Sequence, residues 1–123
     1  MVFRTKTSKK TMEIYAYIQQ REYLQPYILA KISLALAIKN KYRYDGKITD
    51  SNGLDLNRQT ITGENDLLFK KLIEMNEGHS IPEEEYFPDY VKAYMDRGAE
   101  LLEQEYKYSK DIFRHLVELD KGI

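Results

Sequence analysis

The segment from residue 26 to residue 40 constrains the fold more than any other part of this chain. It begins with Pro26, which suits the first position of a helix, so a helix is expected from there to about Asn40. Its apolar residues cover more than one face of that helix: Ile28, Leu29, Ile32, Leu34, Ala35, Leu36 and Ile38. A helix that is apolar all round must be buried. Because 123 residues offer little surface to cover it, we expect self-association through helix 26–40, as a dimer or tetramer.

The residues before this helix predict a strand and another helix. In residues 2–7 two bases, Arg4 and Lys6, alternate with uncharged residues, and this period of two is typical of a short strand. Ser8 is a good N-cap for a helix from Lys9 to about Tyr23. A strand followed by two helices matches the ribbon-helix-helix plan, in which two chains pair their strands into a ribbon that enters the DNA major groove.

The second half of the chain predicts further helices. Residues 41–56 are rich in Asp, Asn, Ser and Gly and favour a loop, and a third helix is expected from about Thr62 to Gly78. Pro88 should interrupt the next helical stretch. Residues 89–119 then predict one long helix or two, in which Gly98 marks a close approach between helices. The expected fold is a single mainly α domain, 1–123, with a ribbon-helix-helix-like strand and two helices followed by more helices.

Charge is distributed unevenly along this sequence. Residues 1–47 hold ten Lys/Arg and three Asp/Glu, a net charge of +7, although the whole chain carries −1. The remaining part, 48–123, is acidic. Such polarity predicts a polyanion-binding end and an acidic end that meets a protein partner. The bases could also be ordinary solvated charges, or stabilise a helix C-terminus. The candidate DNA contacts are Arg4, Lys6, Lys9, Lys10, Lys39, Lys41 and Arg43.

Signals for an enzyme are weak. The sequence has no cysteine, which removes disulfides, thiolate chemistry and Cys-based metal sites from this chain. His79 and His115 lie far apart without metal-ligand spacing, and no phosphate-binding glycine loop or nucleophile motif occurs. We therefore expect no catalytic residue, metal or cofactor. Neither a signal peptide nor an apolar run long enough for a bilayer is found, so a cytoplasmic protein without membrane contact is expected.

A middle segment carries a family resemblance. Residues 53–69 read GLDLNRQTITGENDLLF, and further matching positions are Gly78-His79, Phe87-Pro88 and Arg97-Gly98. In these motifs the sequence resembles the DNA sulfur-modification protein DndE family, over about residues 3–105. It departs from the family at Leu24-Gln25-Pro26, where members often have a threonine–glycine pair.

The resemblance implies a role in bacterial DNA phosphorothioation, in which sulfur replaces a non-bridging phosphate oxygen. It implies a ribbon-helix-helix-like protein that forms a tetramer and binds double-stranded DNA, notably nicked duplex. It also implies partners: a cysteine desulfurase, an ATP-pyrophosphatase-like sulfur carrier and an ATPase. The expected function is that of a non-enzymatic DNA-binding accessory subunit.

Two other functions stay open at this point. One is a ribbon-helix-helix transcriptional repressor, and the other is a metal-dependent DNA nickase that uses acids such as Glu64 or Asp89. The residues around Arg58 also have two interpretations, a DNA-contact loop or a hydrogen-bonded scaffold. The scaffold is favoured, because Thr60 or Thr62 could cap the helix and Arg58 could pair with a nearby acid. Likewise the tyrosines of residues 15–27 favour packing over stacking on exposed bases.

Overall fold

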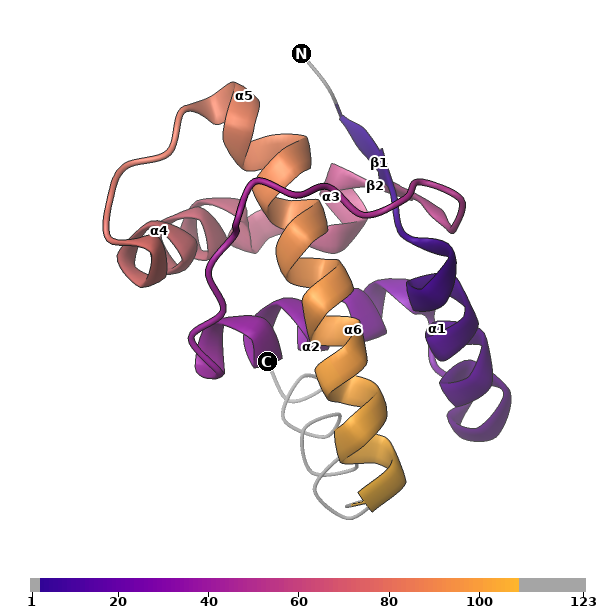
Figure 1. Cartoon of the computed structure of the whole chain (residues 1–123). Coiled ribbons are helices and arrows are strands. Elements are labelled where there is room, and N and C mark those ends of the chain that lie inside the picture. The colour runs from indigo at the N-terminus through magenta and orange to yellow at the C-terminus, as the bar shows by residue number, and fades with distance from the viewer. Residues whose placement is uncertain (1–2, 109–123) are drawn as a thin grey trace.

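The computed structural model describes residues 3–108, and it is mainly helical with a pair of short strands (Figure 1). Both the expected fold class and the N-terminal strand followed by helices are confirmed. The elements are β1 (Arg4–Lys6), α1 (Lys9–Glu22), α2 (Pro26–Lys39), β2 (Asp55–Asn57), α3 (Arg58–Ile61), the 3-10 turn η1 (Gly63–Asn65), α4 (Asp66–Glu77), α5 (Glu83–Glu85), the wide turn η2 (Tyr86–Tyr90) and α6 (Val91–Tyr108). Within residues 3–108, no helix is both long and apolar enough to cross a membrane.

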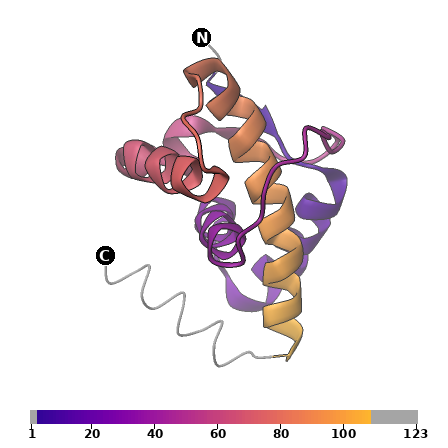
Figure 2. The same cartoon turned by 60° about the vertical axis from the view of Figure 1, so that its left-hand side comes forward.

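Helix α2 lies at the centre of the molecule and contacts α1, α3, α4 and α6. In both views it passes behind or beside α6, with α1 on one side and α4 on the other (Figures 1 and 2). Leu29 and Leu34 are fully buried, and Leu36 is 5% exposed. The expectation that one chain cannot cover helix 26–40 was therefore wrong for most of its apolar residues; Ala35 is exposed, and Ile28 and Ile38 are half-buried. The reason is that α3, α4 and α6, which all follow residue 57, pack around α2.

Helix α1 begins where its sequence predicts and buries one face. The Ser8 hydroxyl accepts a hydrogen bond from the Thr11 amide at 3.0 Å, so Ser8 is the N-cap. Ile14, Tyr15 and Ile18 are buried against the core. After the short turn that follows α1, Pro26 occupies the first turn of α2 as expected.

Strand β1 pairs within the chain, antiparallel to β2. Thr5 lies opposite Leu56, and the pairing continues beyond the strands, because the Thr7 amide donates to the Leu54 carbonyl at 2.8 Å. Gly53 is required here, since a Cβ on it would lie 2.2 Å from the Ser8 carbonyl oxygen. The predicted loop 41–56 thus ends in a strand that pairs with β1.

Helices α3 and α4 replace the single helix expected from Thr62. The N-cap of α3 is Asn57, whose side-chain oxygen accepts a hydrogen bond from the Gln59 amide at 2.7 Å. Thr62 does not cap a helix; its hydroxyl hydrogen-bonds to the Arg58 carbonyl and the Asp66 carboxylate. A threonine cap was thus a wrong prediction.

The interruption at Pro88 and the close approach at Gly98 are both confirmed. Phe87 has extended φ/ψ of −126° and 123°, which separates α5 from α6. A Cβ on Gly98 would lie 1.8 Å from the Ser33 carbonyl oxygen, so the backbones of α6 and α2 touch there. The predicted continuation to residue 119 and His115 lie outside the described residues.

Candidate nucleic-acid interface

The first group of predicted DNA contacts lies on β1 and the first turn of α1. We call Arg4, Lys6, Lys9 and Lys10 the N-terminal cluster; all four are exposed. The strand alternation is confirmed for its bases, since Thr5 between them is buried.

Acids border this cluster, which the sequence pattern did not indicate. Arg4 pairs with Asp55 at 3.0 Å, and Lys10 lies 3.8 Å from Glu100. Lys6 and Lys9 form no ion pair with any residue from 3 to 108. The N-terminal cluster therefore offers two free cations and two that share their charge with a carboxylate.

A buried carboxylate, Asp96, fixes the backbone on which this cluster sits. One of its oxygens accepts the Ser8 amide at 3.1 Å and the Thr11 hydroxyl at 2.7 Å. The other accepts the Thr49 hydroxyl at 2.5 Å and the Lys92 ammonium at 2.9 Å. Asp96 is only 3% exposed and Lys92 only 6%. One acid thus ties together the start of α1, the loop before β2 and α6.

The loop makes a second contact with the start of α1, next to the Asp96 contacts. The Asp50 carboxylate accepts the Lys9 amide at 2.8 Å, and Lys92 donates to the Asp50 carbonyl at 2.8 Å. Hydrogen bonds from the Lys9 and Asn52 amides lower the pKa of the Asp50 carboxyl.

The second group of predicted contacts follows the end of α2. We call Lys39, Lys41 and Arg43 the helix-end cluster; all three are exposed and form no ion pair among residues 3–108. Tyr42 before Arg43 and Tyr44 after it are half-buried. This alternation is typical of an extended segment with one face on the protein. It applies to residues 42–44, where Arg43 is exposed between two half-buried tyrosines, whereas Lys39 ends α2 and Lys41 has a φ of +57°.

The two clusters lie apart. The end of α2 lies on one side of α6, and the start of α1 lies on the other, in both views (Figures 1 and 2). The loop of residues 40–54 joins the two places and passes across α6. A single straight contact face that holds all seven predicted residues is thus not formed within one chain.

Arg58 belongs to the scaffold, as the sequence favours. Its guanidinium pairs with Asp66 at 2.6 Å and with Glu83 at 2.5 Å, and it is only 14% exposed. The hydrogen bond from Arg58 lowers the pKa of the Glu83 carboxyl. The Arg58 guanidinium thus links α3, α4 and α5. Because two carboxylates already neutralise its charge and occupy its N–H donors, it is a poor candidate for contact with a phosphate.

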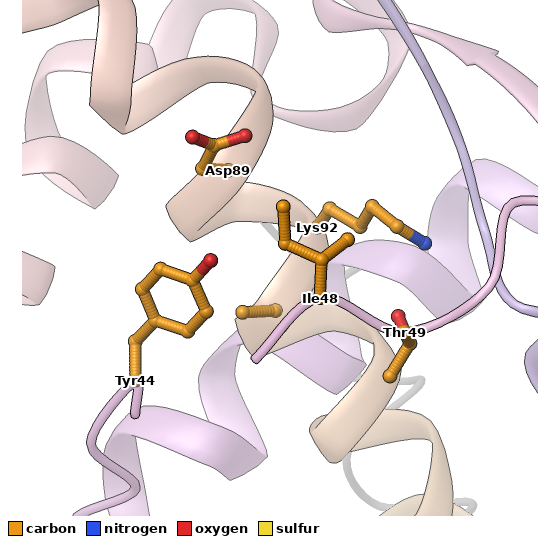
Figure 3. Close-up of a pocket in the computed structure, with 6 residues that line it drawn as sticks. Tyr44, Ile48, Thr49, Asp89 and Lys92 are labelled. Atoms are coloured by element: carbon orange, nitrogen blue, oxygen red, sulfur yellow. The ribbon is translucent and has the colours of Figure 1, made fainter. Parts of the chain in front are cut away.

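A small cavity of about 10 Å³ lies where the loop crosses α6, and it has room for about one water molecule. The Tyr44 hydroxyl points toward Asp89 at one side, and the Lys92 chain extends past Thr49 at the other (Figure 3). Burial, and then the charge of Asp89, raises the pKa of the Tyr44 hydroxyl. This cavity is too small for a substrate or an organic cofactor.

The other residues considered from the sequence, His79 and the tyrosines of residues 15–27, do not form a common site. His79 is exposed and contacts the Ser80 carbonyl at 2.9 Å. Of the tyrosines of residues 15–27, Tyr15 is a core residue, whereas Tyr23 is 90% exposed. From residue 3 to residue 108, no group of three or more acids and histidines has the geometry to hold a metal ion.

Comparisons with known proteins support the resemblance. The family model described as "DNA sulphur modification protein DndE" matches residues 4–110. A crystal structure of DndE from Escherichia coli B7A, involved in DNA phosphorothioation modification, is similar with a TM-score of 0.67 and 18% identity, over 83% of this chain and 97% of that one. A glycine-to-lysine mutant of DndE involved in DNA phosphorothioation gives 0.62 and 19%, over 85% and 99%. No curated protein sequence matches this chain. The two crystal structures share its fold.

Proposed function

This chain belongs to the DndE family of DNA sulphur modification proteins, and we propose that it serves this modification by docking on the DNA backbone. The observation that best supports docking is that five of the seven predicted contacts are exposed cations without an ion-pair partner among residues 3–108. Free cations of this kind release counterions when they meet phosphates, which is the main source of affinity for DNA of any sequence. They are Lys6, Lys9, Lys39, Lys41 and Arg43.

The proposed mechanism is electrostatic and breaks no bond in DNA. The N-terminal cluster and the helix-end cluster each contact phosphates, and the fold holds the start of α1 and the end of α2 on opposite sides of α6. A stiff duplex would meet the two clusters separately, whereas a duplex hinged at a nick could bend toward both. This geometry supports the preference for nicked duplex that we include in the proposal.

Salt dependence of binding tests the docking proposal. Each phosphate contact should add about 0.9 to the slope of log affinity against log salt. Replacing the four residues of the N-terminal cluster by alanine should flatten the slope and weaken binding to all sequences alike. Replacing the three residues of the helix-end cluster should do the same independently. Lys71→Ala is the control, because Lys71 is similarly exposed but pairs with Glu74 outside both clusters. Unchanged affinity and slope in both cluster variants would place the DNA site elsewhere or remove it.

We also propose protein partners. The acidic C-terminal part, residues 83–123 with a net charge of −5, repels DNA and is assigned to the sulfur-transfer and ATPase subunits of the modification complex. Self-association is kept as a proposal, although its original reason is weakened because most apolar residues of α2 are buried within one chain. Light scattering of the purified protein gives its mass, and co-purification with those subunits tests the acidic surface.

The alternative functions are separated by two assays. A repressor would bind one operator sequence far more tightly than other DNA of equal length, whereas docking on phosphates gives similar affinities. A nickase would convert supercoiled plasmid to the nicked form with magnesium or manganese. Nicking that co-purifies with the protein and disappears in Glu64→Gln or Asp89→Asn would overturn the non-enzymatic proposal.

A further inference from the structure

We propose that Glu77 is a positioning residue that holds Arg43 in place for contact with a phosphate. This inference rests on the proposed docking function of the helix-end cluster. Arg43 itself is exposed and touches no carboxylate among residues 3–108, whereas the peptide groups on both of its sides are held by side chains of α4 and α6.

Glu77 holds the peptide group after Arg43. Its carboxylate oxygen Oε2 accepts the Tyr44 amide at 3.0 Å and the Tyr94 hydroxyl at 2.6 Å. Burial first, and then the hydrogen bond to Glu77, raises the pKa of the Tyr94 hydroxyl, so it keeps its proton for this contact. A hydrogen bond to a charged acceptor is shorter and stronger than one between neutral groups.

The peptide group before Arg43 is held by the neighbouring side chain. The Asn76 amide nitrogen donates to the Tyr42 carbonyl and, at 2.7 Å, to the Tyr94 hydroxyl. The Tyr94 hydroxyl oxygen also lies 3.0 Å from the Tyr42 carbonyl, but its single proton is already directed to the closer carboxylate of Glu77. Asn76 therefore serves the carbonyl, and Glu77 serves both the amide and the tyrosine between them.

Packing of the two tyrosine rings completes the arrangement. The Tyr42 ring meets the Tyr94 ring edge to face at 5.0 Å, and the Tyr44 ring meets Tyr90 in the same way at 5.0 Å. With both rings directed inward, the residue between them must point outward. Only the side-chain torsions of Arg43 then remain free, so less conformational entropy is lost when it binds a phosphate.

The sign of one mutational effect separates positioning from plain charge. Glu77 brings a negative charge close to the cluster, so its removal should tighten DNA binding if charge alone mattered. If Glu77 positions Arg43, Glu77→Ala should weaken binding despite the lost repulsion. We expect a loss of about five-fold, close to that of Arg43→Ala. The double variant should bind no more weakly than Arg43→Ala, because the two residues act through one contact.

Two further variants of the full chain control this experiment, which measures fluorescence anisotropy with intact and nicked duplex. Glu74→Ala is the matched control, since Glu74 lies on the same helix and accepts the Ile81 amide at 2.8 Å, away from the cluster. It should bind within about two-fold of the unaltered protein. Glu77→Gln keeps a side-chain carbonyl for the Tyr44 amide and should bind at least as tightly as the unaltered protein.

The outcomes are distinguishable. A folded Glu77→Ala protein that binds as tightly as the unaltered one, or a double variant that loses the product of both single losses, overturns the positioning role. If Arg43→Ala binds normally while the N-terminal cluster variant binds weakly, the inference falls and the docking function stands. If no variant of either cluster changes affinity, the docking function falls as well.

Discussion

Replacing Gly98 by alanine should separate the two central helices. A Cβ on Gly98 would lie 1.8 Å from the Ser33 carbonyl oxygen and 2.3 Å from the Ser33 carbonyl carbon. Ordinary contact begins at 3.4 Å, so the α2 backbone would have to retreat by about 1.6 Å along that line. The obstacle is main chain of a buried helix and not the end of a flexible side chain, so no rotamer change relieves it.

The cost follows from two opposing contributions. Forcing an extra methyl group into a packed core costs about 1–3 kcal/mol, and the fixed backbone places this site at or above the upper end. Alanine in place of glycine gains about 1 kcal/mol of helix propensity. The expected net loss in the free energy of unfolding is therefore about 2 kcal/mol or more.

Urea unfolding followed by circular dichroism measures this loss. Gly46→Ala is the matched control, because Gly46 has a φ of +83° but nothing within 4 Å of its added Cβ. It should lose only about 1 kcal/mol through backbone strain. A Gly98→Ala protein as stable as the unaltered one would refute the reasoning that α2 and α6 touch at this residue.

Three other substitutions have defined outcomes. Asp96→Ala leaves the Lys92 ammonium buried without a carboxylate and should cost about 3–5 kcal/mol in urea unfolding, part of which Lys92→Met in the same chain should restore; an unchanged midpoint would contradict this. Arg58 lowers the pKa of Glu83, so this acid adds stability above its unfolded pKa that is lost as pH falls through the folded value. Arg58→Met should therefore flatten the fall in stability between neutral pH and about pH 3, and an equally steep fall would argue against that linkage. Leu36→Glu should unfold the chain itself and not merely split an oligomer, because Leu36 is buried within one chain; a folded protein of lower mass by light scattering would show the opposite.

Local signals in the sequence predicted where helices begin, end or approach one another closely, because single residues determine these points. Ser8 begins α1, Pro26 begins α2, Gly78 ends α4, and Gly98 marks the contact of two helices. Each of these acts through its own conformational limits or its own side chain, so no knowledge of distant residues was needed.

The pairing partners could not be predicted because they depend on residues far apart in the chain. β2 has three residues and no clear alternation, so nothing in Asp55–Asn57 indicated that it would take the strand position beside β1. The covering of α2 was missed for the same reason.

The roles of the two acids that hold the candidate site in place could not be predicted either. Asp96 and Glu77 read as ordinary helix-surface carboxylates. The spacing of Lys92 and Asp96 by four residues, beside the apolar Val91, Met95 and Ala99, was the one signal that could have indicated a buried pair.

The central position of α2 has a consequence for the order in which the chain is made. Synthesis runs from the N-terminus, so α2 leaves the ribosome long before α6, the helix that covers it most extensively. β1 must likewise wait for residues 55–57. Until α6 has emerged, a nascent chain exposes an apolar helix without the partner that covers most of it. Folding of this protein is thus a late, nearly whole-chain event, and a newly made α2 is the segment that a chaperone would be expected to bind.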